Sequence, residues 1–139
     1  MNSEQGYGSP MTSISTLRDR YKTDSVETMS PGRLIVALYE RLLLDLQRGV
    51  EAIVREDVAA THASLVHAQD IVGELRDSLD TATWPAATQL AGLYDFVLRE
   101  LVEANVSKDA ARVMTCHDLL VPLCDAWREA AGLTVSPQP

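Results

Sequence analysis

The sequence predicts an all-α fold, an antiparallel up-down four-helix bundle preceded by a short helical segment. Its 139 residues, 46% of them apolar, suffice for one domain with a real core but not for two. Seven glycines, six prolines and 5% aromatic residues are few for a many-turned β-sandwich. Four stretches with apolar residues three and four apart, joined by short links, indicate helices that are antiparallel neighbours.

The two ends of the chain lack a pattern that could bury a core. The first tail is rich in Gly, Ser, Asn and Gln, which predicts disorder, and the last contains two prolines. Between them, Ile14, Leu17 and Tyr21 predict one face of a helix too short to be stable alone. The predicted organisation is a disordered tail (1–13), a bundle domain (14–132) that opens with a cap segment (14–24), and a frayed tail (133–139).

The first two helices have clear start signals. Ser30 predicts an N-cap, and Pro31 suits the first turn, where its missing N–H costs nothing. Asp57 is the predicted cap of the second helix, which is expected to end near Asp80. The core positions follow the helical spacing: Ile35, Leu38, Leu42, Leu46, Gly49 and Ile53 in the first helix, and Leu65, Ala68, Val72, Leu75 and Leu79 in the second.

The third and fourth helices repeat the pattern. Thr83 is a candidate cap with Pro85 in the first turn, and either Ser107 or Asp109 is expected to cap the fourth helix. Gly132 supplies the C-terminal stop. The core positions are Ala87, Leu90, Tyr94, Val97, Leu101 and Ala104, then Ala110, Val113, His117, Leu120, Cys124, Trp127 and Ala131. Pro122 lies inside the fourth helix and is expected to kink it.

Composition and spacing argue against several classes of function. A net charge of −8 disfavours nucleic acid as a partner. No basic segment followed by an apolar stretch predicts a signal peptide, and no apolar run is long enough to cross a bilayer. We therefore expect a soluble protein that is not exported and does not insert into membranes.

No catalytic, metal or cofactor site is predicted. His62, His67 and His117 each lack the glutamate three residues earlier that a di-iron bundle needs, and His117 is expected to be a core or boundary residue. Cys116 and Cys124, eight residues apart in one helix, lie about 12 Å from each other, too far for a disulfide, and are interpreted as apolar fillers. An enzyme is disfavoured because no constellation of titratable residues can be assembled.

The first helix has more apolar residues than one buried stripe requires. They cover well over half of its circumference, and Leu93, Phe96 and Leu98 add a similar surplus to the third helix. One interpretation is a tightly packed small bundle. The other is an apolar groove that receives an amphipathic segment of a second copy or of a client, with Ile14, Leu17 and Tyr21 shielding it meanwhile.

Four segments together resemble the FliS flagellar secretion chaperones over about residues 21–131. They are YKTDSVETMSPGRLIVALYERLLLDL, AIVREDVAATHASLVHAQDIVGELRDSLD, LAGLYDFVLRELVEANVSKDAARV and LLVPLCDAWREA. The order and spacing of the Ser-Pro pair, the Leu-Tyr at 38–39, the Leu-Tyr-Asp at 93–95, the Glu-Ala-Asn at 103–105 and the Ala-Trp at 126–127 carry the resemblance.

The resemblance implies a cytoplasmic helical bundle that binds the disordered C-terminal segment of flagellin on apolar grooves. Such binding would block premature polymerisation and deliver the subunit to the export gate, and the segment around Tyr21 would cover part of the client site in the free chaperone. The contact residues implied by the resemblance are Tyr21, Leu34, Leu38, Tyr39, Leu42, Tyr94 and Asn105. Tyr94 is also in core register, so core packing is its alternative role.

This chain departs from the pattern of its relatives at three places. Thr83-Trp84-Pro85 stands where many relatives have a Gly-Gly pair, and Glu40-Arg41 replaces an Asp-Gly. Pro122 stands where relatives continue an ordinary helix, which would reshape the end of a groove. The alternative function is a self-associating helical adaptor without a flagellin client.

Overall fold

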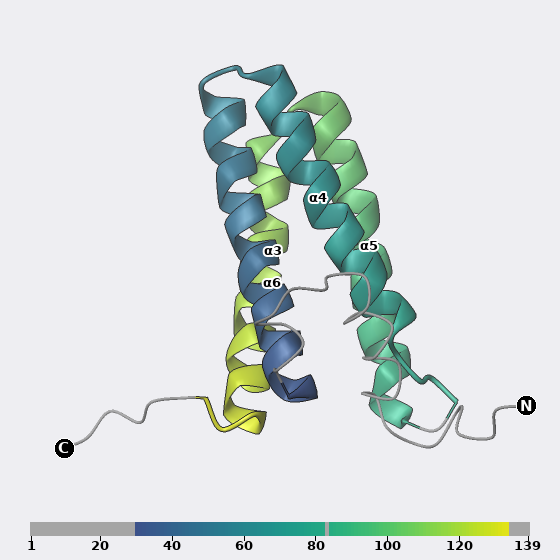
Figure 1. The fold of residues 1–139 in the computed structure, drawn as a ribbon. Helices are drawn as coiled ribbons and strands as arrows, with labels where there is room; N and C mark the ends of the chain where they lie inside the picture. Colours follow the sequence, from purple (N-terminus) through teal and green to yellow (C-terminus); the bar gives the residue numbers. More distant parts are fainter. Residues whose placement is uncertain (1–29, 83, 134–139) are drawn as a thin grey trace, which may run out of the picture.

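The computed structural model describes residues 30–82 and 84–133, which form four long helices (Figure 1). The helices are α3 (Pro31–Val54), α4 (Val58–Asp77), α5 (Pro85–Ser107) and α6 (Ala110–Ala130). No strand occurs among the described residues, and the predicted all-α bundle is confirmed. The predicted tail over 1–13 and the cap segment with Ile14, Leu17 and Tyr21 lie outside the described residues, as does the C-terminal tail after residue 133.

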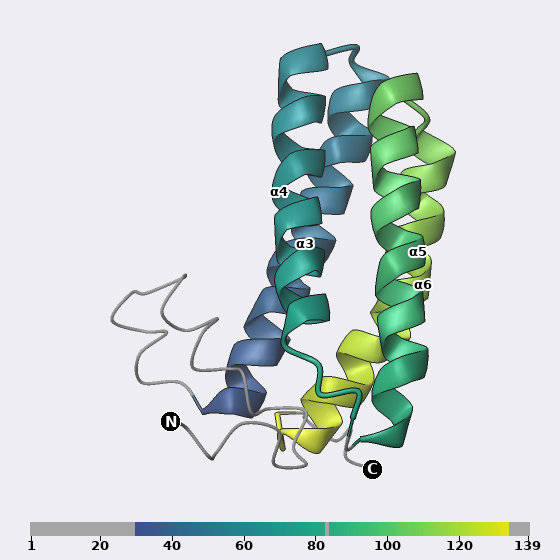
Figure 2. The ribbon, with the colours of Figure 1, turned by 90° about the vertical axis from the view of Figure 1, so that its right-hand side faces the viewer.

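The four helices run alternately up and down (Figures 1 and 2). The links between them are short, so each helix reverses direction and packs beside the one before it. α3 packs against α4 and α6, and α5 closes the bundle against the same two helices. The architecture is therefore the antiparallel up-down bundle that the sequence predicts.

Local signals set most helix ends where the sequence predicts them. The Ser30 Oγ accepts a hydrogen bond from the Arg33 amide, and the Asp57 carboxylate accepts one from the Ala60 amide. Asp109, one of the two predicted caps of the fourth helix, accepts from the amides of residues 111 and 112. Gly132 has φ of +72° and ends α6 in a Schellman arrangement, with its amide bonded to the Glu129 carbonyl.

Two predicted boundaries are shifted. α5 begins after Trp84, whose side chain makes no capping hydrogen bond; the expected cap, Thr83, lies outside the described residues. α4 ends at Asp77, short of the predicted Asp80. The reason is local, because the Ser78 hydroxyl donates to the Leu75 carbonyl and ends the helical hydrogen-bond ladder there.

The core runs along the bundle axis and contains residues from all four helices. Its largest fully buried side chains include Tyr39 of α3 and Tyr94 of α5. α3 and α4 approach closely at Gly49, where a Cβ atom would lie 2.7 Å from the Leu65 Cδ2 atom. Most predicted core positions are buried, but Trp127 is only partly buried and lies at the edge of the core.

α6 stays beside α3 but separates from α5 along its length. Near its start it lies against α5, where the Arg112 guanidinium reaches both carboxylate oxygens of Glu100. Its later part lies beside the beginning of α3 and apart from α5 in both views (Figures 1 and 2). Pro122 was expected to kink this helix. α6 continues through the proline to Ala130, so the proline does not end the helix. The lower ends of α5 and α6 are consequently separated.

Candidate binding groove

A groove opens between the first half of α5 and the last half of α6. Its volume is about 470 Å³, which is within the size range of small ligand pockets and holds only a few side chains. The lining residues are Trp84, Ala86, Gln89, Leu90, Leu93, Leu123, Ala126, Trp127 and Ala130. The groove is thus apolar apart from one amide side chain, and both tryptophans of the chain lie in its walls.

The α5 wall carries no charge. No acidic, basic or histidine residue occurs between Asp80 and Asp95, although the whole chain has a net charge of −8. Ala86 and Gln89 are exposed on this wall, while Leu90 is half-buried. An apolar segment can therefore approach α5 closely without desolvating a charged side chain, which would be costly.

The α6 wall is held by contacts to α3. The Arg128 guanidinium donates to the Glu40 carboxylate at 2.8 Å, and this bond raises the pKa of Arg128. The rings of Trp127 and Tyr39 pack in a tilted arrangement with centroids 6.5 Å apart. These contacts place the last turns of α6 on the α3 side, so that α5 remains uncovered. Farther up, Leu119 lies one helical turn before Leu123 and is 40% exposed.

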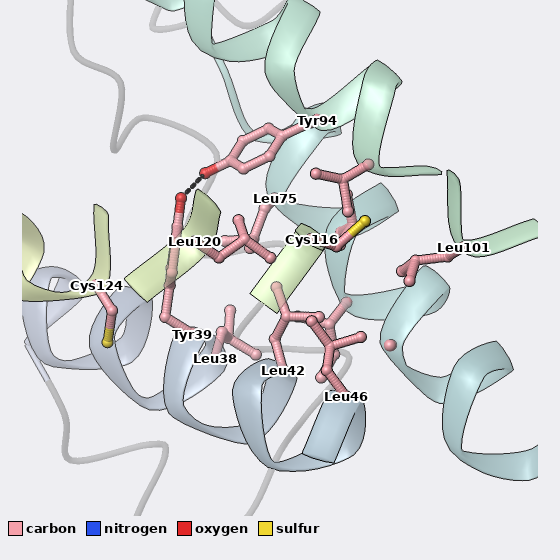
Figure 3. Packing of buried hydrophobic residues seen from close by; sticks show 14 of the residues in the cluster. Leu38, Tyr39, Leu42, Leu46, Leu75, Tyr94, Leu101, Cys116, Leu120 and Cys124 are labelled. Carbon is pink, nitrogen blue, oxygen red and sulfur yellow. Dashed lines mark hydrogen bonds between the residues drawn. The ribbon is translucent and has the colours of Figure 1, made fainter. Parts of the chain in front are cut away.

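Five of the seven contact residues implied by the resemblance lie in the core. Leu34, Leu38, Tyr39 and Leu42 of α3 and Tyr94 of α5 are each no more than 6% exposed. Figure 3 shows the two tyrosines pointing toward each other, with Leu38 and Leu42 on the same side of α3. The two hydroxyl oxygens are 2.5 Å apart and share a hydrogen bond. Burial raises the pKa of both tyrosines, which keeps the hydroxyls protonated.

The other two contact residues are elsewhere. Tyr21 lies outside the described residues. Asn105 is on α5 near the opposite end of the bundle from the groove and is partly exposed. Its amide nitrogen is 2.9 Å from the His62 Nδ1 atom, and its carbonyl oxygen accepts from the Lys108 ammonium at 2.8 Å. The structure therefore brings five of these residues together and leaves Asn105 apart.

The apolar surplus of α3 is mostly buried. Leu34, Ile35 and Val36 are successive residues that together span about 200° of the helix surface, and none is more than 4% exposed. Leu44, at 37%, and Val54, at 74%, are the large apolar residues of α3 that remain exposed. The groove lies instead on α5 and α6, away from the helix in which the sequence shows the largest surplus.

The buried titratable groups have structural partners. The Asp45 carboxylate is buried, accepts a hydrogen bond from Arg41 at 3.1 Å, and is hydrogen-bonded to the His67 imidazole. The bond between Asp45 and His67 joins α3 to α4. Burial raises the pKa of the Cys116 thiol to about 11, so it is a poor nucleophile at neutral pH. His117, the predicted boundary histidine, lies between α6 and α3 with Nε2 3.3 Å from the Gln47 amide.

Within residues 30–82 and 84–133, no helix combines the length and apolarity required to span a bilayer. The same ranges contain no group of three or more His, Cys, Asp or Glu side chains placed to hold a metal ion.

The groove was not predicted from the sequence, because its wall residues fit the residue pattern of ordinary bundle helices. Leu90 and Trp127 occupy core register, and the separation of α5 from α6 is a tertiary feature. Two signals could have pointed to it. One is the uncharged stretch from 81 to 94, and the other is Pro122 immediately before the four lining residues of α6.

Known proteins are similar in sequence to this chain over most of its length. A family profile described as "Flagellar protein FliS" matches residues 14–134. The chain is 30% identical over 110 residues to a flagellar secretion chaperone FliS of Bacillus subtilis (strain 168), covering 79% of this chain and 82% of that protein. It is 31% identical over 107 residues to the FliS of Salmonella typhimurium, covering 76% and 79%.

A further relative is named flagellar secretion chaperone FliSB, from Pseudomonas aeruginosa. It is 30% identical over 113 residues, which cover 78% of this chain and 90% of the relative. These relatives are named as flagellar secretion chaperones, a family without enzymatic activity. The profile match and the identity over most of each chain show that this four-helix chain belongs to the FliS family of flagellar secretion chaperones.

Proposed function

We propose that this protein is a cytoplasmic export chaperone that binds the disordered C-terminal segment of a flagellin. Bound in this way, the segment is unable to enter a polymer before export, and the complex is delivered to the export gate of the flagellum. Membership in a family of flagellar secretion chaperones supports the general role. The apolar groove between α5 and α6 is the observation that carries the binding of a client segment.

The groove suits an amphipathic segment that folds on binding. From Leu119 to Ala130 the exposed face of α6 extends about 16 Å, the length of roughly three helical turns. A helix placed there could insert apolar side chains at i, i+3 or i+4, and i+7 between the two walls. Because the α5 wall is uncharged, apolar contacts would dominate the affinity, and moderate salt would change it little.

The residues implied by the resemblance remain proposed client contacts. Leu34, Leu38, Tyr39, Leu42 and Tyr94 are buried, so a client can touch them only after a local opening of the bundle. Of the other two proposed contacts, Asn105 is partly exposed and Tyr21 lies outside the described residues. The α5–α6 groove is already open and is therefore the first contact that we assign to the client.

The self-associating adaptor is less well supported. A standard protein interface buries about 800 Å² on each partner, whereas the groove accommodates only a few side chains. A second copy would need a much larger apolar face than these walls provide.

The test mixes the full chain with a cognate flagellin C-terminal segment of about 40 residues. We expect a 1:1 complex by calorimetry, gained helicity by circular dichroism and a negative heat-capacity change, because the segment must order as it binds. Absence of a complex at tens of micromolar, together with dimers of the free chain in sedimentation, would favour the adaptor instead.

A matched pair of charge substitutions locates the site. Leu93→Asp places a carboxylate on the half-buried α5 wall and should weaken binding more than tenfold. Val58→Asp introduces the same charge at a residue that is 63% exposed and far from the groove, and should leave binding unchanged. Equal affinities for both variants, at melting temperatures close to that of the wild type, would place the client elsewhere.

A further inference from the structure

Pro122 stands at the point where α6 separates from α5. A proline inside a helix has no amide to give to the carbonyl four residues earlier, here that of Asp118, and its ring crowds that carbonyl. α6 nevertheless continues for two more turns to Ala130. All four α6 residues that line the groove follow the proline in sequence: Leu123, Ala126, Trp127 and Ala130.

The position of the proline on the helix determines the direction of the bend. Crowding between the ring and the preceding turn opens a helix on the side of the ring, so the following segment leans to the opposite side. Pro122 is exposed and lies within about 40° of Ala126 around the helix, on the face that borders the groove. The last turns of α6 are therefore directed away from α5 and toward α3, as both views show (Figures 1 and 2).

Contacts on both sides of Pro122 agree with a course of α6 that leads away from α5. Before it, Arg112 holds α6 against α5 through Glu100 at 3.1 Å. After it, Arg128 bonds to Glu40 of α3. Next to the end of α6, the Ala131 Cβ atom lies 3.2 Å from the position that a Cβ of Gly32 would occupy. α6 is thus joined to both α5 and α3 above the proline, where His117 meets Gln47 of α3, and to α3 below it.

We propose that Pro122 is a positioning residue that holds the α5–α6 groove open for a helical client segment. It acts through the course of α6, because its bend sets the distance between Trp127 and the α5 wall. The proposal rests on the proposed function only in identifying the bound helix as a segment of flagellin. The shape of the groove is a property of the free protein and can be measured without a client.

The test is Pro122→Ala in the full chain. Alanine restores the amide and removes the crowding, so α6 can straighten toward α5. We expect a melting temperature several degrees higher, lower acrylamide quenching of tryptophan emission as both groove tryptophans become covered, and about tenfold weaker binding of the flagellin segment. Higher stability with weaker binding distinguishes positioning from a merely structural role, for which stability and binding would change together.

Gly73→Ala is the matched control. It also improves helix propensity, and its new Cβ would meet no atom within 4 Å, but it lies on α4 away from the groove. We expect it to raise the melting temperature while leaving quenching and affinity at the wild-type values. Weaker binding in this control as well would attribute the effect to rigidity and overturn the role of Pro122.

A second variant separates the two proposals. Ala126→Trp fills the groove with a large side chain at an exposed position and should abolish binding. If it does so while Pro122→Ala binds and quenches like the wild type, the groove is the client site and the role of Pro122 is refuted. If the wild type binds no flagellin segment, the proposed function fails, and tryptophan quenching in Pro122→Ala still decides whether the proline opens the groove.

Discussion

Replacing Gly49 with alanine is expected to destabilise this bundle, although the same change at an open helical site stabilises a protein. Gly49 is buried on α3, and a Cβ there would lie 2.7 Å from Leu65 Cδ2 and 3.4 Å from Leu65 Cγ. Carbon atoms in contact prefer separations of about 3.5–4.0 Å. The Leu65 methyl group would therefore have to withdraw by about 1 Å, and this side chain is completely buried.

The net effect follows from two opposing terms. Glycine to alanine in a helix interior gains about 1 kcal/mol through backbone entropy and helix propensity. Overpacking a core by one methyl group costs about 1–3 kcal/mol. We expect Gly49→Ala to lose about 1 kcal/mol of unfolding free energy. Gly73→Ala, which meets no neighbour, should gain about 1 kcal/mol.

Urea denaturation followed by circular dichroism measures both variants under one set of conditions. With a slope of about 2 kcal/mol per M, the two midpoints should differ by about 1 M, and the slopes should be equal. A Gly49→Ala midpoint at or above that of the wild type would refute the reasoning, because it would mean that α3 and α4 have room for a methyl group at Gly49.

Three further changes test the core and its edge. Trp127→Ala should cost about 2 kcal/mol in urea denaturation, less than the about 3–5 kcal/mol typical of a fully buried tryptophan, because this ring is only partly buried. Tyr94→Phe should cost about 1–3 kcal/mol by removing the hydrogen bond between the two buried hydroxyls, and adding Tyr39→Phe in a double-mutant cycle should restore part of that loss. Since burial raises the pKa of Cys116 from 9.0 to about 11, the unfolded chain loses this proton first as pH rises. Stability should therefore fall by about 1 kcal/mol between pH 8 and pH 10, and Cys116→Ala should fall less; an identical pH profile would contradict the assignment.

Local chemistry determined the helices of this protein from sequence alone. Ser30, Asp57 and Asp109 accept hydrogen bonds from amides within the next three residues, so the sequence nearby suffices to predict where those helices begin. Gly132 likewise adopts a positive φ that few other residues tolerate. Four amphipathic helices with short links leave an up-down bundle as the simple way to bury their apolar faces, and the order of short motifs then indicates the FliS family.

The tertiary structure decided which apolar residues are core and which line a groove. A helical period assigns Leu90 and Trp127 to the same register as Tyr94, but it contains no information on the distance to the next helix. That distance depends on the course of α6 after Pro122 and on Arg128, which bonds to Glu40, a residue 88 positions earlier in the chain. Tyr39 and Tyr94 are buried because four helices meet around them. Trp127 remains partly exposed because α5 and α6 diverge beside it.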